Sequence, residues 1–336
     1  MALAIALAKR AEGMTSPNPI VGAVIVKNRR VVGRGYHKRA GLPHAEINAL
    51  RQAGAKVKGA TLYVTLEPCD HSGRTPPCTA AIIRSGIKRV VIAIEDPNPA
   101  NNGSGIRKLN RYGVRTRVGI LAKDAMAMNR PYIKFITKRI PFVTVKVAQS
   151  LDGKIATKTG DSKWISSGDS RRYVHELRRI SDAVMVGANT VRKDDPLLLS
   201  KLSRGKQPVR VIVSGKSGLP SGAKVCSYLQ RSPVIVVRPS GRFRKKVDLN
   251  KLLKALAKRD ITNILVEGGG ELIAGLVEEN LVDRFLVFIA PKIIGGRDAK
   301  TAVEGNGIEK IKDALCLQNM SVRRFKEDML IEAYTQ

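Results

Sequence analysis

Two short motifs in the N-terminal third of the chain carry residues that could hold a catalytic metal ion. The first is His44-Ala45-Glu46, and the second contains Cys69 and Cys78, each preceded by a proline. A catalytic zinc site uses three protein ligands and leaves one position for water, whose pKa falls to about 7. His44, Cys69 and Cys78 supply such a set. Glu46 is close enough in sequence to exchange protons with that water without ligating the metal.

The combination matches the H-x-E and P-C-x-x-C signature of zinc nucleobase deaminases, except in the spacing of the cysteines. Eight residues, 70–77, separate Cys69 from Cys78. A longer loop costs little more to close, so metal geometry does not forbid this spacing. The alternative is two ordinary buried cysteines and an unrelated histidine. The order of the motifs, each beside an expected helix start, favours the metal site.

The elements that must position these residues follow from the apolar pattern, which predicts an α/β structure in two domains. The basic stretch 138–141 divides the chain into residues 1–140 and 141–336. In the first domain we expect a helix that ends at residue 13, a hairpin over 21–35, further helices at 45–53, 79–85, 106–112 and 122–136, and strands at 61–66, 90–94 and 114–118. In the second we expect strands at 142–147, 183–187, 209–214, 234–238, 264–267 and 284–290, and helices at 170–179, 249–258 and 270–279.

The chain is strongly basic, with 60 Lys and Arg against 28 Asp and Glu and a formal net charge of +32. Nucleic-acid binding is one interpretation of this charge. The alternative interpretations are a preference for phosphorylated metabolites and a proteome that is basic in general. Aromatic residues make up only 4% of the chain, and no basic run is interleaved with them. A stacking platform for single strands is therefore poorly supported.

No apolar run is long enough to span a bilayer, and the N-terminus lacks the basic region of a signal peptide. We therefore expect a cytoplasmic protein that does not bind membranes. Four cysteines do not make a disulfide scaffold. We expect Cys226 and Cys316 to be buried or half-buried thiols.

Taken together, the motifs resemble the bifunctional deaminase/reductase family of riboflavin biosynthesis. The resemblance covers essentially the whole chain and is carried by T-L-E-P-C-D-H-S-G-R-T-P-P-C and by residues 17–19, 96–99, 150–154, 160–165, 194–196, 266–269 and 290–292. It implies a cytidine-deaminase-like domain that deaminates 2,5-diamino-6-(5-phosphoribosylamino)pyrimidin-4-one. It also implies a dihydrofolate-reductase-like domain that reduces the ribosyl side chain to ribityl with NADPH, in a homo-oligomer.

In the deaminase domain the resemblance adds candidate substrate-binding residues beside the zinc ligands. Asn18, between two prolines, matches a position that contacts the pyrimidine, although it could also be a turn residue. His37, His71 and Arg74 lie near or within the loops that flank the ligands. Arg74 is the best candidate for the substrate phosphate because its guanidinium offers two parallel donors. His71 could instead cap its loop. The family often has Gly-Arg-Gly after D-P-N-P, where this chain has residues 100–105 without an arginine. This departure argues against a role for an arginine in this turn.

In the reductase domain, Gly268-Gly269-Gly270 joins an expected strand to an expected helix. Glycines let the backbone approach a phosphate, and a helix N-terminus favours anions, so this junction predicts a cofactor site. It is not the Rossmann fingerprint, and a simple tight turn is the alternative. The resemblance assigns further residues to the cofactor: Ala148, Trp164, Thr190 and Asp194. It assigns others to the substrate: Lys146, Ser162, Arg178, Leu198, Lys201 and Glu267.

Three reductase positions depart from the family. Leu199, Lys201 and Ser214 stand where the family tends to have Thr, Arg and Asp. Lys201 keeps a positive charge but loses the fork of an arginine. A second hypothesis is therefore a deaminase with a weakened or silent reductase domain. A third, based on charge alone, is a nucleic-acid deaminase, which would leave the second domain unexplained.

Overall fold

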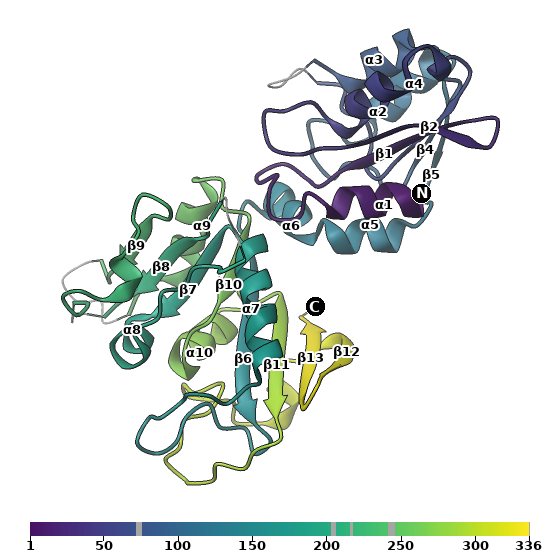
Figure 1. Cartoon of the computed structure of the whole chain (residues 1–336). Coiled ribbons are helices and arrows are strands. Elements are labelled where there is room, and N and C mark those ends of the chain that lie inside the picture. The colour runs from purple at the N-terminus through teal and green to yellow at the C-terminus, as the bar shows by residue number, and fades with distance from the viewer. Residues whose placement is uncertain (72–75, 203–205, 216–217, 241–245, 336) are drawn as a thin grey trace. The chain divides into compact units, whose positions relative to one another are not determined.

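The computed structural model describes residues 1–335 except 72–75, 203–205, 216–217 and 241–245. The chain divides into two compact units, Met1–Arg139 and Ile140–Gln336 (Figure 1). Each unit has its own sheet and its own core. Among the described residues, no helix combines the length and apolar character needed to cross a membrane.

Unit 1 is built on a five-stranded sheet in the order β2-β1-β3-β4-β5. The strands are β1 (Gly22–Lys27), β2 (Arg30–Tyr36), β3 (Thr61–Val64), β4 (Arg89–Ile92) and β5 (Arg115–Val118). β1 pairs antiparallel with both β2 and β3, whereas β3, β4 and β5 run parallel. Asn28 and Arg29 both have positive φ in the β1–β2 turn, as a two-residue turn of type I′ requires.

Helices cover both faces of this sheet (Figure 1). They are α1 (Ala2–Lys9), α2 (Ala45–Ala53), α3 (Cys78–Arg84), α4 (Ser104–Arg111), α5 (Ala122–Met128) and α6 (Arg130–Lys138), with a 3₁₀ turn η1 (Gly54–Val57). α2 lies so close to β2 that a Cβ added to Gly35 would stand 2.2 Å from the carbonyl oxygen of Ala45. This contact fixes the start of α2, the element that carries Glu46.

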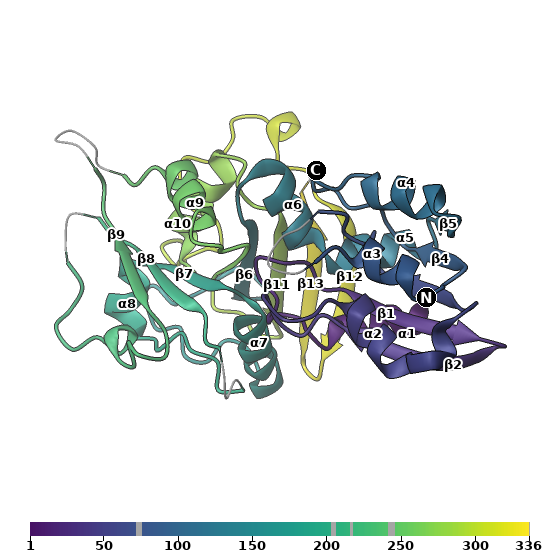
Figure 2. The same cartoon turned by 90° about the horizontal axis from the view of Figure 1, so that it is seen from above.

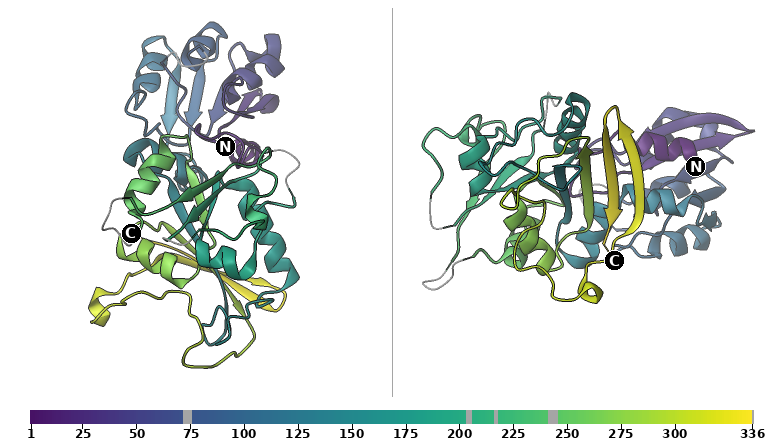
Figure 3. Two further views of the ribbon diagram at one scale, coloured as in Figure 1. Left: turned by 90° about the vertical axis from the view of Figure 1, so that its left-hand side faces the viewer. Right: turned by 90° about the horizontal axis from the view of Figure 1, so that it is seen from below.

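Unit 2 contains an eight-stranded sheet in the order β12-β13-β11-β6-β10-β7-β8-β9 (Figure 2). The strands are β6 (Phe142–Ser150), β7 (Ala183–Gly187), β8 (Val209–Val213), β9 (Val234–Val237), β10 (Asn263–Val266), β11 (Arg284–Ala290), β12 (Gln318–Phe325) and β13 (Asp328–Tyr334). The six strands from β11 to β9 run parallel, and β13 and β12 extend the sheet antiparallel at one edge (Figure 3).

Except in the edge strand β9, both faces of the parallel strands are largely buried, which explains their nearly continuous apolar sequences. One face packs against α9 (Leu249–Ala257) and α10 (Gly270–Glu278). The other packs against α7 (Gly168–Ile180) and α8 (Ala188–Asp194). Two short 3₁₀ turns, η2 (Lys224–Cys226) and η3 (Ile311–Asp313), complete the unit.

Three expectations from the sequence were wrong. The helix expected over 122–136 is two helices, because the Asn129 side chain bonds the backbone N–H and C=O of Ile20 and Pro131 starts a new helix. The first helix ends at Lys9. Cys226 and Cys316 are exposed, since one ends the turn η2 and the other lies in the exposed stretch before β12. In addition, the hairpin of β12 and β13 was not expected.

Candidate active sites

The three expected zinc ligands come together in unit 1. His44 is the N-cap residue of α2, Cys69 lies in the loop after β3, and Cys78 is the first residue of α3. Their ligand atoms all lie within 4.8 Å of one another, and His44 Nδ1 is 3.6 Å from Cys69 Sγ and 3.3 Å from Cys78 Sγ. Tetrahedral zinc would separate a nitrogen and a sulfur ligand by about 3.5 Å, given usual bond lengths of about 2.0 and 2.3 Å. The donor set and its spacing therefore fit zinc.

Glu46 lies in the first turn of α2 with only 3% of its surface exposed. Burial, and then the charge of the nearby Cys69, raise its pKa to about 7. A carboxyl group with this pKa can both accept and release a proton near neutral pH.

The two thiols share one proton in the absence of a metal. Hydrogen bonds from Cys78 and His44 lower the pKa of Cys69 to about 4, although burial opposes this. The hydrogen bond to Cys69, together with burial, raises the pKa of Cys78. One thiolate is therefore ready to ligate, and a metal ion must displace the proton of the second.

Asn18 and His37 lie beside these ligands. His37 is buried, its Nε2 is 3.1 Å from Asn18 Nδ2, and its Nδ1 is 3.4 Å from the carbonyl oxygen of Pro43. A neutral imidazole with its proton on Nδ1 satisfies both contacts, and burial lowers the pKa of His37 in agreement. The ring of His37 meets that of His44 edge to face at 5.2 Å. His71 is exposed, and Arg74 lies outside the described residues.

A layer of buried polar side chains, which no sequence motif marks, holds the Cys69 loop in place. Glu67 accepts hydrogen bonds from the backbone N–H groups of three residues in the segment 96–106. Asn101 is 1% exposed and accepts the N–H of Asp70, the residue after the zinc ligand. A Cβ on Gly105 would lie 2.1 Å from the carbonyl oxygen of Pro68. The segment that departs from the family pattern thus supports the loop through its backbone and Asn101.

Unit 2 contains a cavity of about 730 Å³ next to the start of α10. Five residues expected near the cofactor or substrate line it: Ser162, Thr190, Asp194, Gly269 and Gly270. Ser162 also donates a hydrogen bond to Asp194, at 3.1 Å. Gly269 is the N-cap residue of α10, so the first backbone N–H groups of this helix, which lack the usual partner one turn earlier, begin at the cavity wall. Such a wall suits an anionic ligand.

Three other expected cofactor residues do not line this cavity. A Cβ on Gly268 would lie 2.8 Å from Leu272 Cδ2, so this glycine allows close packing of the turn on α10. Ala148 lies in β6 against the core. Trp164 is 62% exposed, and the Arg171 guanidinium lies 4.5 Å from the centre of its ring.

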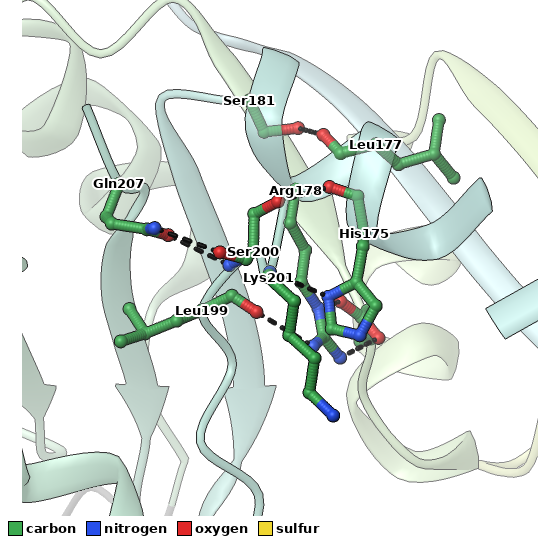
Figure 4. A network of polar contacts seen from close by, with 9 residues as sticks. His175, Leu177, Arg178, Ser181, Leu199, Ser200, Lys201 and Gln207 are labelled. Carbon is green, nitrogen blue, oxygen red and sulfur yellow. Dashed lines mark hydrogen bonds and ion pairs between the residues drawn. The ribbon is translucent and has the colours of Figure 1, made fainter. Parts of the chain in front are cut away.

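A second group of expected residues forms a polar cluster between α7 and the turn after β10 (Figure 4). Arg178 and Glu267 form a bidentate ion pair with N–O distances of 2.6 and 2.9 Å. Burial opposes ionisation of Glu267, but the Arg178 guanidinium outweighs it and lowers the pKa of this carboxyl group. Burial also lowers the pKa of Lys146, against the charge of Glu267.

The cluster also includes the turn that carries Leu198 and Lys201. Leu198 is buried, and its φ of 59° places it in the left-handed region. Arg178 Nη1 donates to the carbonyl oxygen of Leu199 at 3.3 Å, and the N–H of Lys201 donates to His175 Nδ1 at 3.2 Å. His175 was not among the residues expected from the sequence. Its position one helical turn before Arg178 was the available signal.

Comparisons with known proteins connect both sites to one family. Residues 1–94 match the cytidine and deoxycytidylate deaminase zinc-binding region, and residues 141–331 match the RibD C-terminal domain. The riboflavin biosynthesis protein RibD of Aquifex aeolicus is 45% identical, over 98% of this chain and 96% of its own. This chain belongs to the RibD family. RibD of Escherichia coli is 36% identical over 98% of this chain and 97% of its own.

Solved RibD structures have the same fold. RibD of Acinetobacter baumannii (form 1) covers 100% of this chain and 97% of its own, with a TM-score of 0.91 at 36% identity. The diaminohydroxyphosphoribosylaminopyrimidine deaminase/5-amino-6-(5-phosphoribosylamino)uracil reductase of Thermotoga maritima gives the same coverage and TM-score at 38% identity. These matches confirm the expected α/β fold class, with a zinc-binding deaminase domain followed by a RibD reductase domain.

Proposed function

We propose that this RibD family member catalyses two successive reactions of riboflavin biosynthesis on one phosphorylated pyrimidine. Unit 1 deaminates 2,5-diamino-6-(5-phosphoribosylamino)pyrimidin-4-one, and unit 2 reduces the ribosyl chain of the product to ribityl with NADPH. Similarity to the Thermotoga maritima deaminase/reductase over the whole chain supports both steps. The grouping of His44, Cys69 and Cys78 around one point, with Glu46 buried beside them, carries the proposal.

In unit 1 we assign zinc to His44, Cys69 and Cys78. When bound, zinc supplies the Lewis acidity that makes water a nucleophile at neutral pH. Glu46 accepts one proton of the attacking water and passes it to the ring nitrogen. It then accepts the proton of the new hydroxyl group on the ring carbon and passes it to the amine, which leaves as ammonia, and its pKa of about 7 suits both transfers. Asn18, oriented by His37, hydrogen-bonds the pyrimidine. Arg74 and His71 remain candidates for the phosphate.

In unit 2 we assign the phosphates of NADPH to the N-terminal end of α10, with Gly269, Gly270 and Thr190 in the wall around them. NADPH supplies a hydride when bound. Ala148, Trp164, Asp194 and Gly268 remain candidates for the rest of the cofactor.

We assign the substrate of unit 2 to the polar cluster, whose members are Lys146, Arg178, Leu198, Lys201 and Glu267, with Ser162 from the cavity wall. The sugar chain and its phosphate need hydrogen-bond donors and positive charge, and three of these residues are cationic. Their task is alignment, because hydride transfer needs correct geometry more than a strong acid.

The departures at Leu199, Lys201 and Ser214 do not favour a silent reductase. Arg178 uses the backbone carbonyl of Leu199, so this contact does not depend on the side chain there. Ser214 lines a cavity that is large enough for part of a dinucleotide. NADPH absorbance in the presence of purified protein and the deaminated pyrimidine phosphate tests the proposal. Steady NADPH oxidation is expected, and its absence under conditions that allow deamination would leave only the deaminase.

We also propose that a second copy of the chain covers β12. This strand is the edge of the sheet, with 69% of Met320 and 53% of Val322 exposed. Exposed apolar edge strands invite pairing with another chain. Light scattering is expected to give the mass of a dimer or larger assembly for the wild type and of a monomer for Val322→Lys. A monomeric wild type would contradict this.

A cytoplasmic location fits the same proposal. None of the four cysteines forms a disulfide, and Cys69 and Cys78 must stay reduced to hold zinc.

A further inference from the structure

The turn of residues 198–202 carries the charged side chain of Lys201, and the proposed function does not explain what positions it. Lys201 is exposed, and its ammonium group forms no ion pair with any residue that the structure describes. Its backbone, in contrast, is held: the N–H of Lys201 donates to Nδ1 of His175, on α7, at 3.2 Å. The side chain of His175 therefore determines where this lysine leaves the turn.

The same hydrogen bond fixes the tautomer of His175. Because Nδ1 accepts a hydrogen bond, the proton of the neutral ring must sit on Nε2. Protonation of Nδ1 would remove the acceptor. Burial, and then the charges of Arg178 and Lys201, lower the pKa of His175, which keeps the ring neutral at physiological pH. A hydrogen bond with the backbone of Leu199 and the charge of Glu267 oppose this lowering, but Glu267 is itself paired with Arg178.

The rest of the turn is anchored without this side chain. Ser200 Oγ donates to the backbone carbonyl of His175 at 2.7 Å. Ser200 and Gln207 exchange two further hydrogen bonds, at 2.8 and 2.9 Å. Figure 4 shows the Gln207 contacts on one side of Ser200, and His175, Lys201 and Arg178 on the other. Replacing the imidazole should therefore free the Lys201 peptide and leave the fold of the turn intact.

We propose that His175 is a positioning residue for the substrate of the reductase reaction: by accepting the N–H of Lys201, it aims the Lys201 ammonium group, beside Arg178, at the phosphate of the deaminated pyrimidine. The inference rests on the proposed function of unit 2 and deepens it. A lysine is a flexible point charge, unlike the planar fork of an arginine, so its reach depends more on where its backbone is fixed.

Two variants separate this role from a purely structural one. His175→Leu removes the acceptor. His175→Asn keeps one, because its amide oxygen can occupy the position of Nδ1. For His175→Leu we expect the KM for the deaminated pyrimidine phosphate to rise about tenfold, the effect of losing one charge-assisted contact, with kcat changed less than about twofold. His175→Asn should restore most of the KM.

The dephosphorylated form of the same pyrimidine is the matched probe, because Lys201 has no phosphate to bind there. Wild type and His175→Leu should use it with the same KM. The proposal is overturned if His175→Leu leaves the KM of the phosphorylated substrate unchanged, if it raises both KM values equally, or if His175→Asn behaves like His175→Leu. A wild type that binds NADPH and substrate without oxidising NADPH would instead overturn the proposed function. Calorimetric binding of the pyrimidine phosphate to the two variants would then decide the role of His175.

Discussion

Arg178 and Glu267 lie 89 residues apart in the chain, and their side chains form a two-pronged ion pair at 2.6 and 2.9 Å. Only 16% of the arginine side chain and 10% of the glutamate side chain are exposed. Each of them was expected to bind substrate, and each is the principal partner of the other. The pair therefore holds two side chains of the polar cluster of unit 2 in fixed, partly buried positions.

Removing one member of this pair should lower both the stability and the activity of unit 2. Glu267→Gln leaves Arg178 charged and half-buried without its counter-ion, which we expect to lower the free energy of unfolding of unit 2 by about 3 kcal/mol. Urea unfolding followed by circular dichroism measures this. The double variant Arg178→Met/Glu267→Gln is the control and should recover part of the loss, since no unpaired charge remains. Equal stability of Glu267→Gln and wild type would contradict the account.

The reductase should lose substrate affinity in acid. The pKa of His175 is lowered from its ordinary value of 6.5. The imidazole is therefore neutral at neutral pH, and it becomes protonated only as the pH falls below 6.5. The KM for the deaminated pyrimidine phosphate is therefore flat at neutral pH and rises as the pH falls through the lowered pKa. The second pKa of the substrate phosphate is itself about 6. His175→Asn retains that titration, so the difference between the two KM profiles isolates the histidine. Superimposable profiles would remove His175 from the pH response.

Alanine substitutions at two neighbouring glycines, Gly269 and Gly270, should have different effects. A Cβ on Gly270 would lie 2.7 Å from the carbonyl oxygen of Thr301, whereas the nearest atom to a Cβ on Gly269 is Thr190 Oγ1, at 4.0 Å. Gly270→Ala should cost about 1–3 kcal/mol of stability through overpacking. Gly269→Ala should keep the stability and weaken NADPH binding, because its methyl group enters the cavity wall. Thermal unfolding and NADPH titration distinguish them, and equal stability of the two variants would count against this geometry.

Metal removal should separate the two activities. Dialysis against a zinc chelator is expected to abolish deamination and to spare NADPH-dependent reduction of the already deaminated pyrimidine, since all proposed zinc ligands lie in unit 1. Added zinc should restore deamination. If reduction were lost as well and returned with zinc, the metal would have a role in unit 2 that its residues do not explain.

Local patterns predicted much of the fold and of the zinc site. α2 spans Ala45–Ala53 as expected, because its apolar spacing and its start after His44 are local signals. The order of the zinc motifs likewise follows from residues adjacent in sequence to their helices.

Features that depend on distant partners were not predictable. The break at Asn129 requires hydrogen bonds to Ile20, 109 residues away. Glu67 and Asn101 are ordinary polar residues until the fold buries them against backbone N–H groups. His175 acquires its role only because the turn at Lys201 folds back onto α7.

Glu46→Gln provides the most direct test of the central claim that unit 1 is a zinc deaminase acting ahead of the reductase. The variant keeps all three ligands and loses the carboxyl group that moves protons, a contribution of about 10²–10⁴ in rate. Zinc content should be unchanged, and ammonia release from the diaminopyrimidine phosphate should fall by at least about 100-fold. The variant should still oxidise NADPH at the normal rate with the deaminated substrate. Full ammonia release by zinc-loaded Glu46→Gln would contradict the account.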